Sequence, residues 1–353
     1  MINKHLPGLN GIRAIACLMV FYGHFNGIIA PAYSIAHSGP DIASLGVTCF
    51  FTLSGFLITT LLLQEKTVTG GISIRNFYMR RILRIWPLYF FIILLGVTSF
   101  SYYHLPAEKS TYFLFYIFFA GNLAYTLNTC IWIINPLWSV AVEEQFYLFW
   151  PFLVKTAKVG KSILLFIAAF LVLKVVARSA STGLLYFLNF TRIDCMGIGG
   201  LLAWLNYIKF APLRLLYTKG CQLFCWAVFA YCMVRPFHLI SLFDEEIYSL
   251  VAGVIILNVS HNPRTLFTLE NGVLNHIGKI SYGMYAYNVP LLYAWSYLLP
   301  AEKARTIPLL ADSLWIILLG LNLLVAHLSY YGFERKFLLL KARFEETPVP
   351  SLA

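Results

Sequence analysis

Two acidic residues interrupt an apolar stretch in the middle of this chain. Glu143 and Glu144 lie within residues 136–147, most of which are apolar or aromatic. A carboxylate inside hydrocarbon is costly unless it faces protein or water, so such residues mark functional sites by default. Neighbouring residues on a helix point about 100° apart, so the two carboxylates cannot share one environment. We expect one to face a protein interior and the other to reach a loop or a basic partner.

A second polar pair occurs in the first apolar stretch of the sequence. Arg13 and His24 are eleven residues apart, which is about three helical turns, so they share a helix face and are separated by about 16 Å along the axis. Imidazole takes up a proton near neutral pH, which would make His24 a general base. The alternative is a core histidine with an interfacial arginine below it, and the spacing alone favours neither.

An arginine cluster precedes another apolar stretch. Arg80, Arg81 and Arg84 lie just before Trp86, and Arg80 and Arg84 share a helix face. Guanidinium groups bind phosphates through paired hydrogen bonds, so the cluster could hold a phosphorylated cofactor. Charge alone favours a simpler interpretation, in which these arginines anchor the chain at the cytoplasmic surface of a membrane and contact lipid headgroups.

A step of two small residues, Ser54 and Gly55, interrupts a further apolar stretch. Small residues permit close approach of helices, and this is the favoured interpretation. The functional alternative is a narrow passage or a backbone that faces a ligand. Ser54 lacks the flanking glycines of a nucleophile elbow, so we do not predict that it carries an acyl group.

These residues require a membrane-embedded scaffold to position them. The chain is 59% hydrophobic and 12% charged, whereas soluble domains are roughly 25% charged. Long apolar runs near the ~20 residues of a membrane span predict an all-α, polytopic integral membrane bundle of about ten transmembrane helices, and they exclude a β-barrel. A shorter apolar segment, residues 112–127, is predicted to be re-entrant or partly spanning. The predicted spans are residues 11–30, 44–64, 84–103, 139–154, 162–178, 194–208, 220–238, 246–260, 280–299 and 312–332.

The net charge of +11 does not indicate a nucleic-acid partner, because the basic residues lie in short loops on alternating sides of the spans. If both termini are cytoplasmic, the acidic residues 244–246 and the loop 31–41 fall outside. The basic residues then expected outside are Lys109, Lys174, Arg178, Arg192, Arg235, Lys303 and Arg305. The seven cysteines show no paired metal spacing, so we interpret them as core residues and expect no metal.

The chain is predicted to form one domain, residues 1–343, followed by a short cytoplasmic tail, residues 344–353, that we expect to be disordered. Two further charged pairs are interpreted as interfacial ion pairs. These are Arg192 with Asp194, and Glu334 with Arg335.

Together these segments resemble the acyltransferase-3 family of membrane acyltransferases, from about residue 6 to residue 337. Any one of the matching segments would be weak, but seven in the same order are specific. They are residues 9–16, 46–58, 77–89, 138–147, 192–203, 278–285 and 333–337.

The resemblance implies an enzyme of the bacterial inner membrane that takes an acyl group, usually acetyl, from cytoplasmic acetyl-CoA. The acceptor would be a hydroxyl of a cell-envelope or exported polysaccharide, or of its lipid-linked precursor. His24 would be the general base or a transient acyl carrier, and Glu143 would orient His24 or shape the acceptor path. The CoA phosphates would be held by Arg13, Arg80, Arg81 and Arg84. The substrate path would include Ser54, Gly55, Tyr285 and Asn288.

Donor and acceptor are expected to enter from opposite sides of the membrane, through two vestibules that meet at His24, because the CoA phosphates cannot cross hydrocarbon. The chain departs from the family in having Asn288 where many members have histidine, and in having no aspartate near Thr48. No extracytoplasmic esterase-type domain follows, so a separate partner protein is expected. The alternative function is a transporter or flippase of an anionic lipid-linked substrate, disfavoured because the sequence shows no internal repeat.

Overall fold

The computed structural model describes residues 6–33, 35, 42–102, 107–235, 240–300 and 310–344, and the described residues form helices and no strand. Each predicted span overlaps one α-helix of the described chain, so the all-α prediction is confirmed; residues 103 and 236–238 of two predicted spans lie outside the described residues. These helices are α1 (Leu9–Ala32), α2 (Ile42–Thr69), α3 (Ile74–Tyr102), α6 (Leu137–Lys155), α7 (Val159–Ala180), α9 (Ile193–Tyr207), α10 (Lys219–Cys232), α11 (Asp244–His261), α12 (Gly272–Leu298) and α14 (Leu310–Ser329).

Five helical segments of the described chain are long and apolar enough to cross a membrane. They are Leu9–Ala32, Ile42–Thr69, Ile74–Ser99, Val159–Ala180 and Ser313–Phe344. The other predicted spans lie on shorter or more polar helices: α9 has 15 residues, a rise of about 22 Å against a hydrocarbon core of about 30 Å. The protein is therefore a polytopic membrane bundle, whereas the figure of ten crossings stays a prediction.

The short apolar segment 112–127 is not one continuous helix. It contains α4 (Phe113–Ile117) and α5 (Gly121–Thr126) after a 3-10 turn, η1 (Ala107–Tyr112). The chain reverses between α4 and α5, where Phe119 has a φ of 52°. That this segment is re-entrant or partly spanning stays a prediction.

Two α-helices of the described chain, α8 (Thr182–Thr191) and α15 (Arg335–Leu340), were not predicted. α8 occupies the link between two predicted spans and ends at Arg192, whose φ of 48° turns the chain directly into α9. The remaining elements are the short turns η2 (Trp132–Ile134) and η3 (Ala211–Tyr217), the π-helical turn η4 (Tyr330–Glu334) and η5 (Lys341–Phe344).

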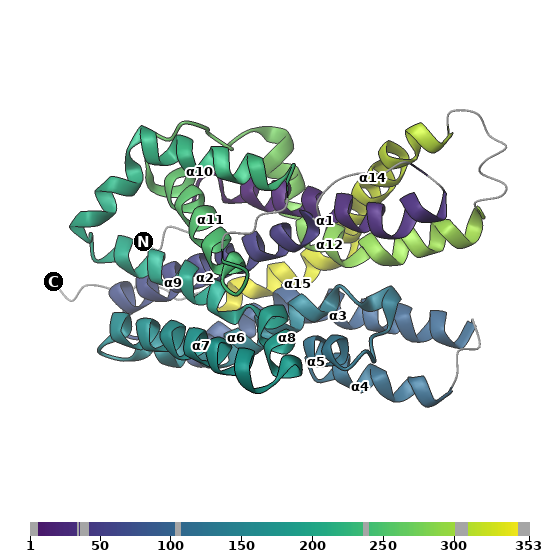
Figure 1. Cartoon of the computed structure of the whole chain (residues 1–353), viewed down its shortest axis with the longest axis horizontal. Helices are drawn as coiled ribbons and strands as arrows, with labels where there is room; N and C mark the ends of the chain where they lie inside the picture. The colour runs from purple at the N-terminus through teal and green to yellow at the C-terminus, as the bar shows by residue number, and fades with distance from the viewer. Residues whose placement is uncertain are drawn as a thin grey trace.

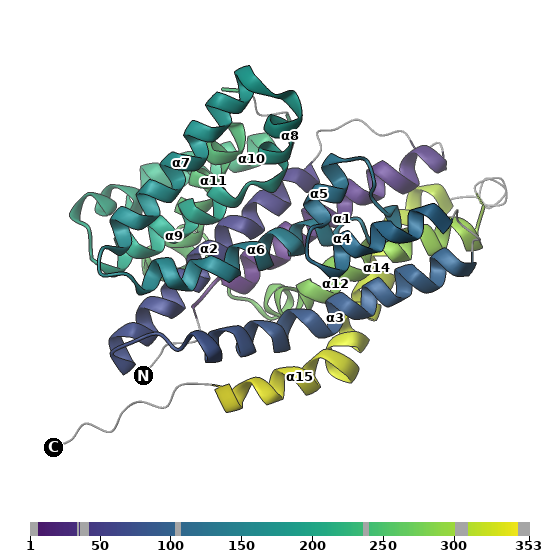
Figure 2. The ribbon, with the colours of Figure 1, turned by 90° about the horizontal axis from the view of Figure 1, so that it is seen from below.

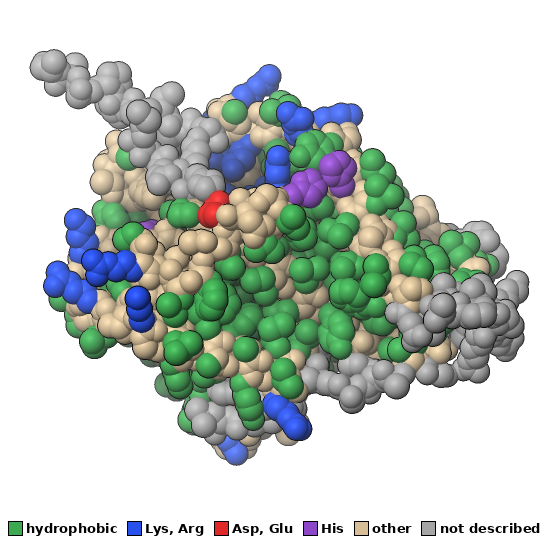
Figure 3. Space-filling view, turned by 90° about the horizontal axis from the view of Figure 1, so that it is seen from above, with side chains coloured by type: hydrophobic (Ala, Val, Ile, Leu, Met, Phe, Trp, Pro, Cys, Tyr) green, Lys and Arg blue, Asp and Glu red, His purple; other side chains and the backbone are tan. Residues whose placement is uncertain are grey.

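The helices are arranged around α1 and α2 (Figures 1 and 2). α1 packs against α12 and α2, and α2 packs against α9. α10 and α11 lie on one side of this centre, and α3, α4 and α5 lie on the other. Hydrophobic side chains cover much of the face in Figure 3.

Glycines allow the backbones of α2 and α9 to touch. A Cβ atom at Gly55 would lie 1.8 Å from the carbonyl oxygen of Met196, and one at Gly199 would lie 2.0 Å from that of Thr52. No larger residue fits at such distances. Gly55 therefore has the close-packing role that small residues commonly have between membrane helices, while its neighbour Ser54 points toward α6.

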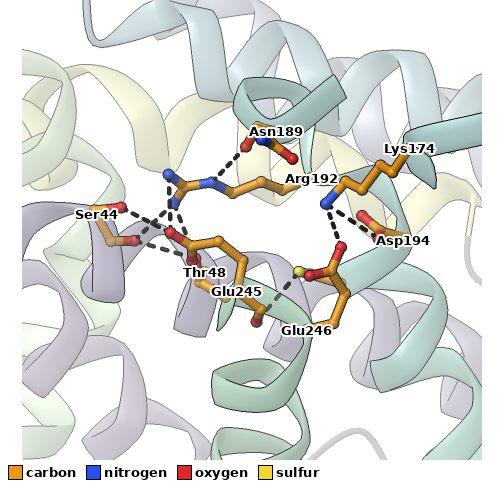
Figure 4. A network of polar contacts seen from close by, with 9 residues as sticks. Ser44, Thr48, Lys174, Asn189, Arg192, Asp194, Glu245 and Glu246 are labelled. Atoms are coloured by element: carbon orange, nitrogen blue, oxygen red, sulfur yellow. Dashed lines mark hydrogen bonds and ion pairs between the residues drawn. The ribbon is translucent and has the colours of Figure 1, made fainter. Parts of the chain in front are cut away.

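Buried charges join α7, α9 and α11 (Figure 4). The ammonium of Lys174 pairs with Glu246 and lies 3.6 Å from Asp194. Lys174 and Asp194 are both fully buried. A buried charge is tolerated only when it is paired, so these helices can pack only in this register.

A second part of the same network fixes Arg192. Its guanidinium pairs with Glu245 at 3.1 Å and donates to the hydroxyl of Thr48 at 3.0 Å. The predicted ion pair between Arg192 and Asp194 is therefore wrong, because Arg192 pairs with Glu245 and Asp194 lies beside Lys174. These partners come from α11 and α7, and sequence proximity did not indicate them.

Candidate active site

A cavity of about 100 Å³ lies among five helices, α1, α2, α3, α6 and α12, and brings together several predicted site residues. Arginines enter it from α1 and α3, a carboxylate from α6 and a hydroxyl from α2. The polar side chains that line it are Arg13, Ser54, Arg81, Arg84, Ser139, Glu143, Tyr147, Ser281, Tyr282 and Tyr285. We call it the arginine cavity.

The arginines that line this cavity have no ion-pair partner among the described residues. Arg13 donates to the side-chain oxygen of Asn10 at 3.0 Å. Arg81 is 7% exposed, and its Nε has no hydrogen-bond partner in the described part of the chain. No carboxylate of the described residues lies within 4.0 Å of Arg13, Arg81 or Arg84. Buried cations without partners are costly, so the cavity is suited to an anionic ligand.

Arg80 differs from the other arginines of the predicted cluster. It pairs with Glu65 at 2.6 Å and donates to the carbonyl oxygen of Phe344 at 2.9 Å. Glu65 also accepts from the backbone N–H of Ser73 at 2.8 Å. Arg80 does not line the arginine cavity; it joins α2, α3 and the C-terminal segment.

The two adjacent glutamates of α6 have different surroundings, as the helix geometry predicts. Glu143 lines the arginine cavity, where its two oxygens accept from Ser54 at 2.8 Å and Tyr147 at 3.1 Å. Glu144 faces α3 instead and accepts from the indole N–H of Trp86 at 3.0 Å. Only Glu143 can therefore interact with a ligand in this cavity.

His24 lies in a second cavity, of about 650 Å³, which we call the histidine cavity. A sugar-sized group fits the volume of this cavity better than the smaller volume of the arginine cavity. Aromatic and small polar residues form most of its wall. The lining includes Gly23, His24, Asn26, Ser44, Tyr125, Trp132, Asn135, Trp138, Phe190, Arg192, Tyr285 and Tyr293.

Val47 and Tyr285 line both cavities and form the partition between them. The hydroxyl of Tyr285 lies 2.6 Å from that of Ser139 and donates to the carbonyl oxygen of Pro136 at 3.1 Å. Tyr285 is therefore held by α6, although it belongs to α12. Arg13 and His24 lie on opposite sides of this partition, on the same helix.

The other predicted path residues have different positions. Ser54 lines the arginine cavity, whereas Gly55 lies in the contact between α2 and α9. Asn288 is 1% exposed and lines neither cavity. Five cysteines are buried and two are partly exposed, all with free thiols, in agreement with a packing role. The described residues contain no group of three possible metal ligands.

Sequence reasoning missed several residues of the site. Tyr147 lies four residues after Glu143, on the same helix face, so this pair could have been found from spacing. Ser139, Tyr282 and Arg192 could not have been, because their roles depend on contacts between helices that are distant in sequence.

Comparison with known proteins points to one family. A family model described as an acyltransferase domain matches residues 6–331. The O-acetyltransferase OatA of Staphylococcus aureus strain NCTC 8325 / PS 47 is 28% identical over 376 residues, which cover 98% of this chain and 57% of that protein. A provisionally named O-acetyltransferase of strain COL is 27% identical over 370 residues. The chain thus spans 57% of the length of these relatives. No solved structure matches it.

Proposed function

The chain belongs to the acyltransferase-3 family, and from this premise we propose that it transfers an acetyl group from acetyl-CoA to a hydroxyl group of a cell-envelope glycan or its lipid-linked precursor. The relatives named O-acetyltransferases support the choice of acetyl and of a hydroxyl acceptor. The observation that carries the proposal is the arginine cavity, in which Arg13, Arg81 and Arg84 have no carboxylate partner among the described residues. A donor with several phosphates supplies the missing negative charge.

The donor enters by the arginine cavity. The cavity's volume of about 100 Å³ is small beside the about 650 Å³ of the histidine cavity, so it suits a narrow pantetheine arm and not a nucleotide. The CoA phosphates remain at the mouth, near Arg81 and Arg84, while the thioester is directed inward. Arg80 pairs with Glu65 and so holds α3 against α2 next to this mouth.

The acceptor hydroxyl occupies the histidine cavity. His24 takes the proton of that hydroxyl, and the oxygen attacks the carbonyl carbon of the thioester. The carbon–sulfur bond then breaks, the acetyl group remains on the sugar, and the CoA thiolate takes the proton back from the imidazolium. A route through an acetyl-imidazole of His24 as an intermediate gives the same products, with the acetyl group on the sugar and the proton on the CoA thiol. In either route the acetyl group has to pass the partition of Val47 and Tyr285.

Glu143 acts on the donor side. Since it shares a cavity with the arginines, we assign it to positioning: its carboxylate holds the Ser54 and Tyr147 hydroxyls and balances part of the arginine charge. The notion that it orients His24 has less support, because His24 lines the other cavity.

The proposed location is the bacterial inner membrane, with both termini in the cytoplasm. Acetyl-CoA is available there, and the positive-inside rule expects Arg80, Arg81 and Arg84 on that side. The glycan then approaches from the opposite side, with a separate extracytoplasmic protein as a further partner.

The experiment is acetyl transfer by purified protein in lipid nanodiscs, with radiolabelled acetyl-CoA and glycans extracted from the host. We expect His24→Ala to abolish transfer to the glycan while retaining the binding of CoA, because the base is lost and the arginine cavity is not. Cys49→Ala, a buried change in α2 that lines neither cavity, is the control. Near-normal transfer by His24→Ala would contradict the mechanism, and movement of an unmodified lipid-linked substrate across the bilayer would favour the transporter.

A further inference from the structure

A group of basic and aromatic side chains lies beside the arginine cavity, and the proposed mechanism does not use it. The ammonium of Lys279 lies 5.1 Å from the ring centre of Tyr330 and 5.4 Å from that of Tyr331. The guanidinium of Arg335 lies 5.9 Å from the ring centre of Tyr331. We call these four residues the rim. Neither Lys279 nor Arg335 has a carboxylate within 4.0 Å among the residues that the structure describes.

Two histidines extend the rim. The ring of His327 lies 4.7 Å from that of Tyr331, and its Nδ1 is 3.1 Å from Nε2 of His276. One of these two nitrogens must carry the hydrogen. In Figure 3, histidine, lysine and arginine side chains gather around a hollow on one face of the molecule.

The rim borders the arginine cavity. Lys279 lies one helical turn before Tyr282, which lines the cavity. The hydroxyl of Tyr282 donates to the carbonyl oxygen of Ile85 at 2.8 Å, and Ile85 directly follows Arg84. Tyr282 therefore links the rim to the arginine cavity: Lys279 of the rim precedes it on α12, and its hydroxyl contacts Ile85, which follows Arg84 on α3.

The chain forms the rim by an unusual backbone turn. Tyr330 and Tyr331 begin the π-helical turn η4, which leads into α15. α15 and η5 then run along α3, where Arg80 holds the carbonyl oxygen of Phe344. π-Helical turns are rare and frequent at functional sites. Here the turn brings two adjacent tyrosines against Lys279.

We propose that the rim binds the adenosine 3′,5′-bisphosphate end of CoA. Aromatic rings stack on an adenine, and lysine and arginine side chains that have no carboxylate partner bind phosphate. The rim offers both, next to a cavity too narrow for a nucleotide. Tyr330 and Tyr331 bind the base, and Lys279 and Arg335 bind the 3′-phosphate. The inference rests on the proposed function, since it takes CoA as the donor.

The test compares two nucleotides that differ by one phosphate. Purified protein in nanodiscs of neutral phosphatidylcholine is titrated with CoA and with 3′-dephospho-CoA, and binding is measured by calorimetry. We expect the protein to bind CoA about tenfold or more tightly, as for one lost charge-assisted contact. The variant Lys279→Ala/Arg335→Ala should lose this preference and bind both nucleotides alike.

Two further variants separate the parts of the rim. Tyr331→Leu should weaken the binding of both nucleotides by the same factor, because both contain adenine. Lys336→Ala is the control for Arg335: it removes a positive charge that is also exposed but points about 100° away on the helix, and it should leave the preference unchanged.

The outcomes distinguish this inference from the proposed function. If the protein binds neither nucleotide, CoA is not its donor and the proposed function fails. If CoA binds and Lys279→Ala/Arg335→Ala keeps the preference for it, the rim is not the 3′-phosphate site and only the inference fails. If that variant changes only the binding to vesicles of anionic lipid, the rim contacts lipid headgroups, and the inference is again overturned.

Discussion

Adjacent residues of one helix can have separate tasks, as the glutamates of α6 do. Glu143→Gln should lower the rate of acetyl transfer roughly ten- to hundredfold, because hydrogen bonds to a charged group are worth ~1.5–3 kcal/mol. Glu144→Gln should lower it less than about threefold, since an amide oxygen still accepts from Trp86. Initial rates at saturating acetyl-CoA give the comparison, with thermal melting as the check on folding. Equal losses in the two variants would contradict the assignment of Glu143 to the cavity.

Arg80 and Arg84 are also expected to have separate tasks, Arg80 in stability and Arg84 in binding the donor. Arg84→Gln should raise the KM for acetyl-CoA about tenfold or more, through a lost phosphate contact, with little change in melting temperature. Arg80→Gln should instead lower the melting temperature, because it leaves the buried carboxylate of Glu65 without its partner, at a cost of ~3–5 kcal/mol.

Steady-state kinetics and thermal unfolding of the two purified variants check this prediction together. The expected results are opposite, so each variant is the control for the other. A raised KM in Arg80→Gln with unchanged melting would assign Arg80 to the donor after all.

Among the elements, the contact between α2 and α9 makes the strictest demand on the sequence. Gly55→Ala should reduce stability by several kcal/mol, more than the ~1–3 kcal/mol of ordinary overpacking, because its Cβ would lie 1.8 Å from a backbone oxygen that cannot rotate away. Gly320→Ala is the control, since no atom lies within 4 Å of a Cβ built there. Unfolding in detergent measures both. Equal stability of Gly55→Ala and the natural chain would show that the two helices are free to separate.

The elements also show what the sequence could predict. Hydropathy located a helix in each of the ten predicted spans, five of them long and apolar enough to cross a membrane, because a membrane span has to be a long apolar run. It missed α8, because a helix of 10 residues is too short to cross and resembles a connecting loop. It could not pair Arg80 with Glu65, or Lys174 with Glu246, because such contacts depend on which helices are neighbours.

At the scale of the whole molecule, the sequence predicted several residues that line the two cavities, but not which cavity each of them lines. Helical spacing correctly predicted that the two glutamates of α6 would have different surroundings. Spacing could not show that His24 and Glu143 line separate cavities, since this depends on how α12 packs between α1 and α6. Tyr285 acquires its position from that packing alone.

The partition of Val47 and Tyr285 has a consequence for the cell that is independent of the acyl chemistry. An inner membrane stores energy as a proton gradient and an electrical potential, and each elementary charge that crosses it releases about 2.3 kcal/mol per 100 mV. If two water-accessible vestibules were joined into one continuous channel, ions would cross the membrane and dissipate the gradient and the potential. In the proposed mechanism, Tyr285, which two hydrogen bonds hold between the cavities, would let a neutral acetyl group pass while the bilayer remains an insulator.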